Sequence, residues 1–432
     1  TFSGTLSIGC STSIVDTDGE FDIGTLRIDA GELYIADDDP GFDKYGAKET
    51  PLGGTVYYDC AGDQTIVGDD EDWANVYTNL VLRGGGNKSL VCPNIDIITK
   101  ITLENGTFWL GNATGTVRVG YDVDSEGTVI EIQGEGTLTG PAKLGAWGNA
   151  TVAAGGTFTI DKFYLRSATG EHSVLSAETG STVNIPTLEI WNQSGTGCAS
   201  YIGPQTLTCD TMSLVSTATA QKFFFGAPIT CTDIIIDAKS ALYDLGNYAA
   251  DVSGNISGAG DIFLEQGGDI DRAGTSSCSL SGTISVDNKD SFINSDGEFD
   301  IGTLTMTNGS LTIADGDPTF TFGTLSGGTV NYDGAESIPS LPVGNYHNLT
   351  LDKAPTLAYE NCGAITSGLA EEWDGGESKI WKPSMILVRN WYADEWHGFA
   401  KFGLDNLSSI DVREIVSARL YLNVEFINGN PN

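Results

Sequence analysis

The chain has 432 residues, and its 58 acidic and 21 basic side chains give a formal net charge of −37. A charge of this size repels nucleic acid and anionic membrane surfaces, so neither is expected as a partner. No apolar run is long enough to cross a bilayer as a helix, so membrane insertion is not expected either.

From Thr1 onward, short β-branched and aromatic runs alternate with Gly, Asn or Asp, and 56 glycines stand beside only 13 prolines. This texture is typical of strands joined by tight turns. Related segments follow one another at a spacing of about 20 residues, which is typical of a repeat architecture. A plain β-sandwich does not suit so long a stretch. The pattern therefore predicts an all-β fold, with a right-handed parallel β-helix or related β-solenoid over residues 1–355.

The start of the chain recurs near residue 280. The segments FSGTLSI, DGEFDIGTLRI, LYIADDDP, GGTVYYD and YTNLVL correspond to LSGTISV, DGEFDIGTLTM, LTIADGDP, GGTVNYD and YHNLTL. The equivalent residues include Phe21 and Phe299, Tyr58 and Tyr332, and Leu80 and Leu349. Recurrence of this kind predicts stacked units that bury a core against their neighbours.

Acidic residues gather around glycine turns in three places. The groups are Asp16, Asp18, Glu20 and Asp22; its distant copy Asp296, Glu298 and Asp300; and Asp122, Asp124 and Glu126. A further turn, residues 37–39, recurs as Asp315 and Asp317. Alternating oxygen ligands around a glycine suit a hard cation, so a structural Ca²⁺ is the one cofactor predicted. The alternative is a set of solvated acidic turns.

The eight cysteines include no C-x-x-C pair, so disulfides are expected if the chain is exported. Cys209 and Cys231 lie 22 residues apart in LTCDTMSL and ITCTDIII, which resemble the same strand in successive turns. Such equivalents stack about 4.8 Å apart in a parallel sheet, within the range of a disulfide. The predicted pair is therefore Cys209–Cys231, and the alternative is two buried free thiols.

Nine Asn-x-Ser/Thr sequons favour an exported glycoprotein. They lie at Asn87, Asn105, Asn112, Asn149, Asn192, Asn255, Asn308, Asn348 and Asn406. The strand pattern begins at Thr1 rather than after a Met and a targeting segment. We therefore expect an extracellular or cell-surface protein whose signal peptide has been removed.

Composition changes after Pro355, which predicts a second, smaller β-sandwich-like module over residues 356–432. Four of the eight tryptophans lie there, at Trp373, Trp381, Trp391 and Trp396. Packing is the commoner role for such tryptophans, and stacking on sugars is the alternative.

Several of these phrases resemble a family. GGTVYYD…YTNLVL, GGTVNYD…YHNLTL and VSGNISGAGDIFLEQGG are similar to repeats of large secreted bacterial and archaeal surface proteins, the haemagglutinin- and autotransporter-like adhesins. The stretch from Trp396 to Phe426 resembles the first half of jelly-roll modules of secreted carbohydrate-active and surface proteins, although Gly403 stands where that family usually has Asp. The resemblance implies a solenoid displayed outside the cell, followed by a partial jelly roll.

The favoured hypothesis is a structural protein that assembles with copies of itself. A solenoid end without a cap exposes unpaired backbone groups, and half a jelly roll leaves strand edges open. Each end is expected to cover the other in the next subunit, giving a head-to-tail filament. The predicted junction residues are Phe2, Leu6, Ile8, Phe399, Phe402, Leu420, Leu422 and Phe426.

Two other hypotheses remain. One is a monomeric adhesin stalk that binds surface glycans through its C-terminal module. The other, less favoured, is a polysaccharide lyase or hydrolase. The three histidines, His172, His347 and His397, are too scattered to define a His-centred site, and close carboxylate pairs arise by chance in so acidic a chain. Catalytic activity is therefore not expected.

Overall fold

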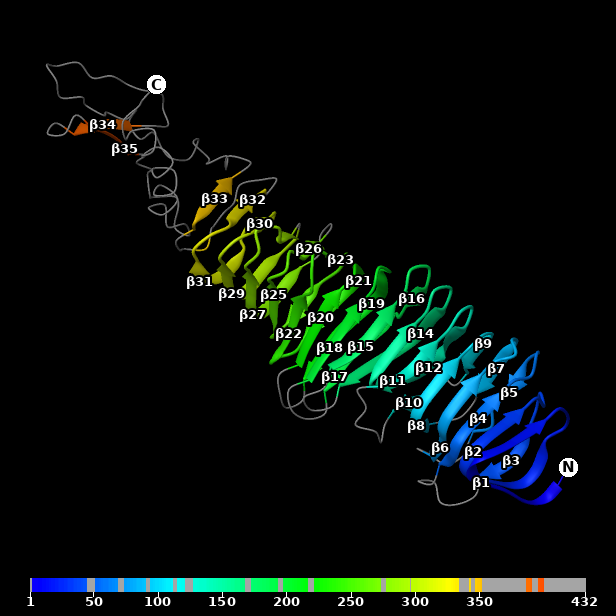
Figure 1. The fold of residues 1–432 in the computed structure, drawn as a ribbon. Helices are drawn as coiled ribbons and strands as arrows, with labels where there is room; N and C mark the ends of the chain where they lie inside the picture. The colour runs from blue at the N-terminus through cyan, green and yellow to red at the C-terminus, as the bar shows by residue number, and fades with distance from the viewer. Residues whose placement is uncertain are drawn as a thin grey trace, which may run out of the picture.

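The computed structural model describes residues 2–44, 51–68, 74–90, 94–111, 115–120, 127–167, 172–192, 197–216, 221–272, 277–295, 297–333, 342, 346–351, 386–390 and 395–399. Among these residues, 33 strands join one network of parallel ladders, and two more form an antiparallel pair. The parallel network winds into a β-solenoid of about 14 turns, seen as a long rod in Figure 1. The predicted all-β parallel solenoid is confirmed.

Each full turn of the solenoid crosses three faces, named A, B and C here. In one turn, β17 (Thr187–Asn192) lies on face C, β18 (Gly197–Ile202) on face A, and the start of β19 (Leu207–Ser216) on face B. The rest of β19 returns to face C and pairs with β17, so that Leu188 lies beside Met212, 24 residues on.

The other strands follow the same order along the chain. Strands that turn a corner and contribute to two faces are β1 (Phe2–Thr17), β2 (Asp22–Ile35), β4 (Leu52–Tyr58), β6 (Ala74–Leu82), β8 (Asn94–Leu103), β12 (Thr137–Trp147), β14 (Thr157–Ser167), β21 (Ile229–Ile236), β27 (Cys278–Val286), β29 (Phe299–Met306) and β31 (Thr319–Leu325). Face A also holds β11 (Thr128–Ile132), β13 (Asn149–Val152), β15 (His172–Ala177), β20 (Gln221–Gly226), β22 (Ser240–Asp244) and β25 (Asp261–Leu264). Face B also holds β5 (Gln64–Thr65), β7 (Asn87–Leu90), β9 (Thr107–Leu110), β16 (Thr182–Asn184), β23 (Ala249–Val252), β26 (Asp269–Arg272), β28 (Phe292–Ser295), β30 (Ser310–Ile313), β32 (Thr329–Tyr332) and β33 (Asn348–Leu351). Face C also holds β3 (Gly41–Lys44), β10 (Thr116–Val119) and β24 (Ile256–Gly258).

The core consists of columns of stacked side chains. Alternation along a strand sends every second side chain inward, and the parallel register places equivalent side chains about 4.8 Å apart in successive turns. One column on face C runs through Leu188, Met212, Ile234, Ile256, Cys278 and Phe299, none of them more than 1% exposed. Each large apolar side chain buried in this way contributes roughly 1.5–3 kcal/mol to folding, so the columns hold the turns together.

Glycine allows the chain to bend sharply between faces. Gly258 ends β24 with a φ of +121°, and a Cβ there would lie 2.1 Å from the carbonyl oxygen of Ile236 in the preceding turn. Only glycine combines this backbone conformation with so close an approach.

The two copies of the duplicated segment occupy different faces. Leu33 lies on face A, where β2 pairs with β4, whereas its duplicate Leu311 lies on face B, where β30 pairs with β32. Leu304 lies on face A, although it duplicates Leu26 of face C. The second copy is therefore turned by one face around the solenoid relative to the first.

Contacts inside the two copies nevertheless match. Phe21–Phe42 and Phe299–Phe320 pack edge to face with ring centroids 6.1 and 6.0 Å apart, and the hydroxyl oxygens of Tyr58–Tyr77 and Tyr332–Tyr346 lie 2.8 and 3.1 Å apart. The duplication thus preserves local packing units.

The described part of the C-terminal region is the antiparallel pair β34 (Ile386–Asn390) and β35 (Glu395–Phe399). The predicted module over residues 356–432 otherwise lies outside the described residues and stays a prediction.

Candidate functional site

The carboxylate of Asp315, in one of the acidic turns, accepts hydrogen bonds from two backbone amides. Asp315 Oδ2 accepts one from the amide of Phe299 at 2.7 Å, and Asp315 Oδ1 accepts one from the amide of Asp317 at 3.1 Å. In the first copy, Asp37 accepts the same two bonds, from Phe21 and from Asp39. In both copies, the aspartate therefore connects its turn to the start of a long strand, β2 in the first copy and β29 in the second.

The first predicted metal group is not gathered into a ligand set. Asp16 lies in β1 beside Tyr34 of β2, and Asp22 begins β2 beside Gly41. Asp18 and Glu20 lie in the exposed turn between these strands. Over the whole described part of the chain, no three His, Cys, Asp or Glu side chains converge in a way that could hold a metal ion.

In the distant copy, the neighbouring carboxyl group of Asp300 is the main cause of the raised pKa of Glu298. Asp315 and Asp317 add smaller repulsive contributions. Asp296, Asp122, Asp124 and Glu126 lie outside the described residues. Calcium binding therefore stays a prediction.

Cys209 and Cys231 stack in register on face B, as the sequence predicted. Their Sγ atoms are 3.0 Å apart, and both side chains are buried. The thiol of Cys209 donates to Cys231, which raises the pKa of Cys209 and lowers that of Cys231. The two sulfurs are present as thiols, and the disulfide between them stays a prediction.

The sequons that the structure describes lie at the surface. Five of these asparagines, Asn87, Asn105, Asn255, Asn308 and Asn348, are exposed, and Asn149 is half-buried. Asn192 ends β17, and nothing is described of its side chain. Asn112 and Asn406 lie outside the described residues. Glycosylation of the nine sequons stays a prediction.

A column of three aromatic rings runs along the outside of face A. Phe224, Tyr243 and Phe263 are in register on β20, β22 and β25. Their ring centroids lie 5.1 and 4.7 Å apart, and all three side chains are half-buried. Ile202 and Leu245, exposed by 40% and 42%, lie along one edge of this column. Together they form an apolar strip on a strongly acidic molecule.

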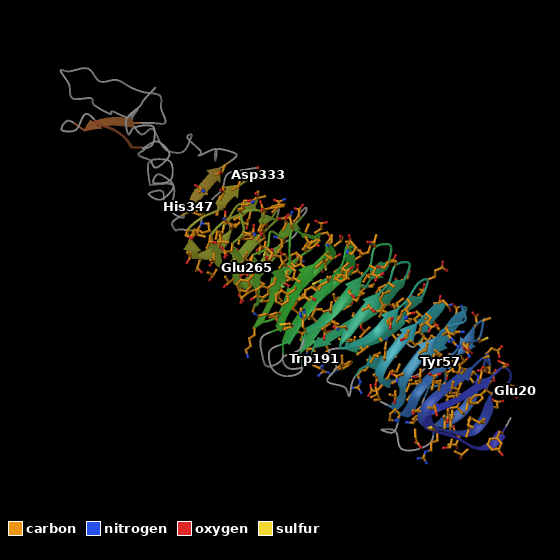
Figure 2. All side chains as sticks on the ribbon, viewed as in Figure 1. Glu20, Tyr57, Trp191, Glu265, Asp333 and His347 are labelled. Carbon is orange, nitrogen blue, oxygen red and sulfur yellow. The ribbon has the colours of Figure 1, made fainter. Side chains whose placement is uncertain are left out.

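Charges are placed unevenly around this strip. Lys222 lies at one end, with its Nζ 5.1 Å from the centroid of the Tyr243 ring. Asp261 and Glu265 lie at the other end, on and just after β25, and Figure 2 shows Glu265 on the flank of the rod. Burial, followed by repulsion from Glu265 and Asp261, raises the pKa of Tyr243.

In two other columns of aromatic side chains, an arginine guanidinium packs against the rings. The guanidinium of Arg83 lies 4.8 Å from the ring centroid of Tyr34 and 5.0 Å from that of Tyr57. On face C, Arg166 lies 4.9 and 4.2 Å from the ring centroids of Trp147 and Trp191, which occupy the turns on either side of it. These stacked contacts link successive turns.

The first turn exposes residues that its internal duplicate covers. Phe2 is 57% exposed, whereas its equivalent Leu280 is 1% exposed beneath the preceding turn. Ile14 is 65% exposed, whereas its equivalent Phe292 is half-buried. Leu6 is half-buried and Ile8 is buried against β2. Of the other predicted junction residues, Phe399 ends β35 with no side chain described, and Phe402, Leu420, Leu422 and Phe426 lie outside the described residues.

The two described histidines lie far apart in the stack. His172 begins β15 on face A, 6.0 Å from the ring of Phe224, and burial lowers its pKa. His347 is exposed just before β33. They do not share a site.

The fold defines the class of the molecule, a parallel β-solenoid. No protein-family model matches the chain, and no curated protein or solved structure matches it either. The likenesses to adhesin repeats and to a jelly roll stay predictions. Within the described residues, no helix combines the length and the apolar character needed to cross a membrane.

The sequence did not predict the aromatic strip on face A. Its signal lies in the segments KFFFG, SALYD and DIFLE, in which Phe223, Leu242 and Ile262 point inward and the next residue points outward. Aligning these segments turn by turn would have placed the three outer rings in one column.

Proposed function

We propose that the chain is an extracellular structural rod whose copies join end to end through the first turn of the solenoid. The observation that carries this proposal is the comparison of the first turn with its duplicate. Residues 2–17 and 280–295 align without a gap, and the internal copy has a turn paired on each side. In the first turn, β1 pairs with β2 and with no other strand among the described residues.

The free edge of β1 can pair with a strand of another copy. A strand edge presents a row of unpaired backbone donors and acceptors, which is a template for a further strand. Phe2 and Ile14 add exposed apolar surface along that edge. A second copy that stacks on β1 would pair the edge and bury both side chains.

The outer surface supports an extracellular location. Five described sequon asparagines are exposed and accessible to modification, and the formal charge of −37 makes copies repel each other at long range. Calcium that binds among the acidic turns would reduce the repulsion between copies. This role is proposed together with the assembly.

The experiment replaces both exposed residues, with the variant Phe2→Asp/Ile14→Asp, in the full chain. Two carboxylates at the edge should block stacking, so negative-stain images should show filaments for the unmodified protein and single rods for the variant. Ile235→Asp is the matched control, because Ile235 is exposed by 37% on face C. Filaments of equal length from all three proteins would overturn the proposal.

A further inference from the structure

The outer surface of face A between β18 and β25 is arranged so that it complements itself. Its middle strand, β22, carries Tyr243 and the buried Ala241 on its outer side, and Leu245 follows directly after the strand. The strand before it presents Lys222 and Phe224, and the strand after it presents Asp261 and Phe263. We call these residues, together with Ile202, Gly226 and Glu265, the face A patch.

The register gives this patch an approximate two-fold pattern about β22. Lys222 and Asp261 both pair with Ala241, one turn to either side of it. Phe224 and Phe263 pair with Tyr243 in the same way. Rotation by 180° about the line of β22 therefore exchanges lysine with aspartate and phenylalanine with phenylalanine.

We propose that the face A patch binds the same patch of a second copy, with the two rods antiparallel. Lys222 of each copy then lies opposite Asp261 of the other, and Phe224 lies opposite Phe263. Tyr243 and Leu245 meet their own counterparts on the axis. Gly226 leaves space opposite Glu265.

Charge complementarity selects a second copy as the occupant. The molecule as a whole is strongly acidic and repels its copies, but this patch places one lysine and one aspartate where an antiparallel partner pairs both. None of the nine sequons lies on β18, β20, β22 or β25, so no glycan at those sites would be attached to the patch itself. A bound sugar fits less well, because Tyr243 stacks face to face on Phe263 and its ring face is covered.

The patch is small, so a single contact through it should be weak. Four strands about 4.8 Å apart and five residues long, at about 3.3 Å per residue, cover roughly 300 Å². A stable interface needs about 800 Å² per partner. A single contact is therefore weak, and many contacts between two filaments would bundle them through multivalency. This bundling rests on the proposed end-to-end function, whereas the pairwise contact does not.

The test measures self-association by sedimentation equilibrium of the full chain in the Phe2→Asp/Ile14→Asp background, in which end-to-end joining is blocked. Lys222→Glu and Asp261→Lys each place like charges opposite each other twice, so each should weaken dimerisation about tenfold. A mixture of the two variants pairs opposite charges at both positions and should restore association to within about threefold. Lys289→Glu, on an exposed turn, is the control for net charge and should change association less than twofold.

Asp261→Lys distinguishes the local charge pair from the overall charge. It lowers the net negative charge, so it would strengthen association if overall repulsion alone determined the affinity. The Asp261 side chain also accepts a hydrogen bond from the amide of Thr283, so thermal unfolding should verify that this variant is folded. Leu245→Glu is a second variant that does not depend on Asp261. It places two carboxylates together on the axis and should abolish association, whereas Ile235→Glu should not.

The proposal is overturned if the end-blocked chain stays monomeric at every concentration, if Lys222→Glu and Lys289→Glu weaken association equally, or if the mixture associates no better than its parts. Binding of a neutral oligosaccharide to the patch without dimerisation would assign it to a glycan instead. Antiparallel dimers from a chain that forms no filaments would support this contact and count against the proposed function alone.

Discussion

Asp315 shows how a residue chosen as a candidate metal ligand serves the backbone. Both carboxylate oxygens accept amide hydrogen bonds, and Asp37 repeats the arrangement in the first copy. An aspartate that caps a turn in this way satisfies donors that would otherwise be unpaired. The acidic turns therefore have a structural role whether or not calcium binds them.

Replacing Asp315 with alanine should destabilise the turns around β29 by about 2 kcal/mol, because two hydrogen bonds to a charged group are lost. Hydrogen exchange at the amide of Phe299 is the direct measurement, and its protection should fall. Asp317→Ala is the control, because Asp317 contributes its backbone amide to this turn. Equal effects of the two substitutions would count against the capping role of Asp315.

Cys209 and Cys231 lead to a second prediction at this scale. In an oxidising buffer they should form a disulfide that adds about 3 kcal/mol in the chain-entropy model for a loop of this length. Peptide mapping without reductant should find the linked pair. Cys278 should stay a thiol, because Ile256 and Phe299 flank it in its column and burial raises its pKa to about 11. An unlinked pair under these conditions would leave the alternative of two buried thiols.

At the scale of the strands, the sequence predicted the contacts between neighbouring turns better than their position around the axis. The 22-residue spacing of Cys209 and Cys231 predicted their stacking, because a parallel register repeats once per turn. It could not predict that Leu33 and Leu311 lie on different faces. That shift depends on every corner between the copies, and turn lengths vary with glycines and register shifts.

The corners also produce a prediction. Gly258→Ala should be severely destabilising, by about 2 kcal/mol or more, because the added Cβ would meet the backbone of Ile236 at a φ that disfavours alanine. Gly9→Ala is the control, since a Cβ there meets nothing within 4 Å. Urea unfolding followed by circular dichroism compares the two. Similar midpoints would show that the corner can relax, contrary to this prediction.

For the whole molecule, charge and stacking oppose each other. The chain carries a net charge of −37, and each added copy brings the same charge. Apolar columns and paired strand edges act over short distances and can outweigh a repulsion that salt screens. Assembly should therefore strengthen as ionic strength rises.

Calcium gives a sharper prediction at this scale. Ca²⁺ titrated at millimolar concentrations into chelator-treated protein should raise the melting temperature more than Mg²⁺ does at the same concentration. Equal shifts with Mg²⁺, or with NaCl of matched ionic strength, would reduce the effect to screening. The absence of any shift would remove calcium from the description of this protein.

The most direct test of end-to-end joining is the axial repeat of the native assembly, measured by electron microscopy. About 14 turns at about 4.8 Å per turn make each rod roughly 67 Å long. End-to-end joining predicts continuous filaments with a repeat of at least this length and with density stacked directly on β1. Isolated rods at high protein concentration, or filaments in which β1 stays exposed and only the flanks touch, would contradict it.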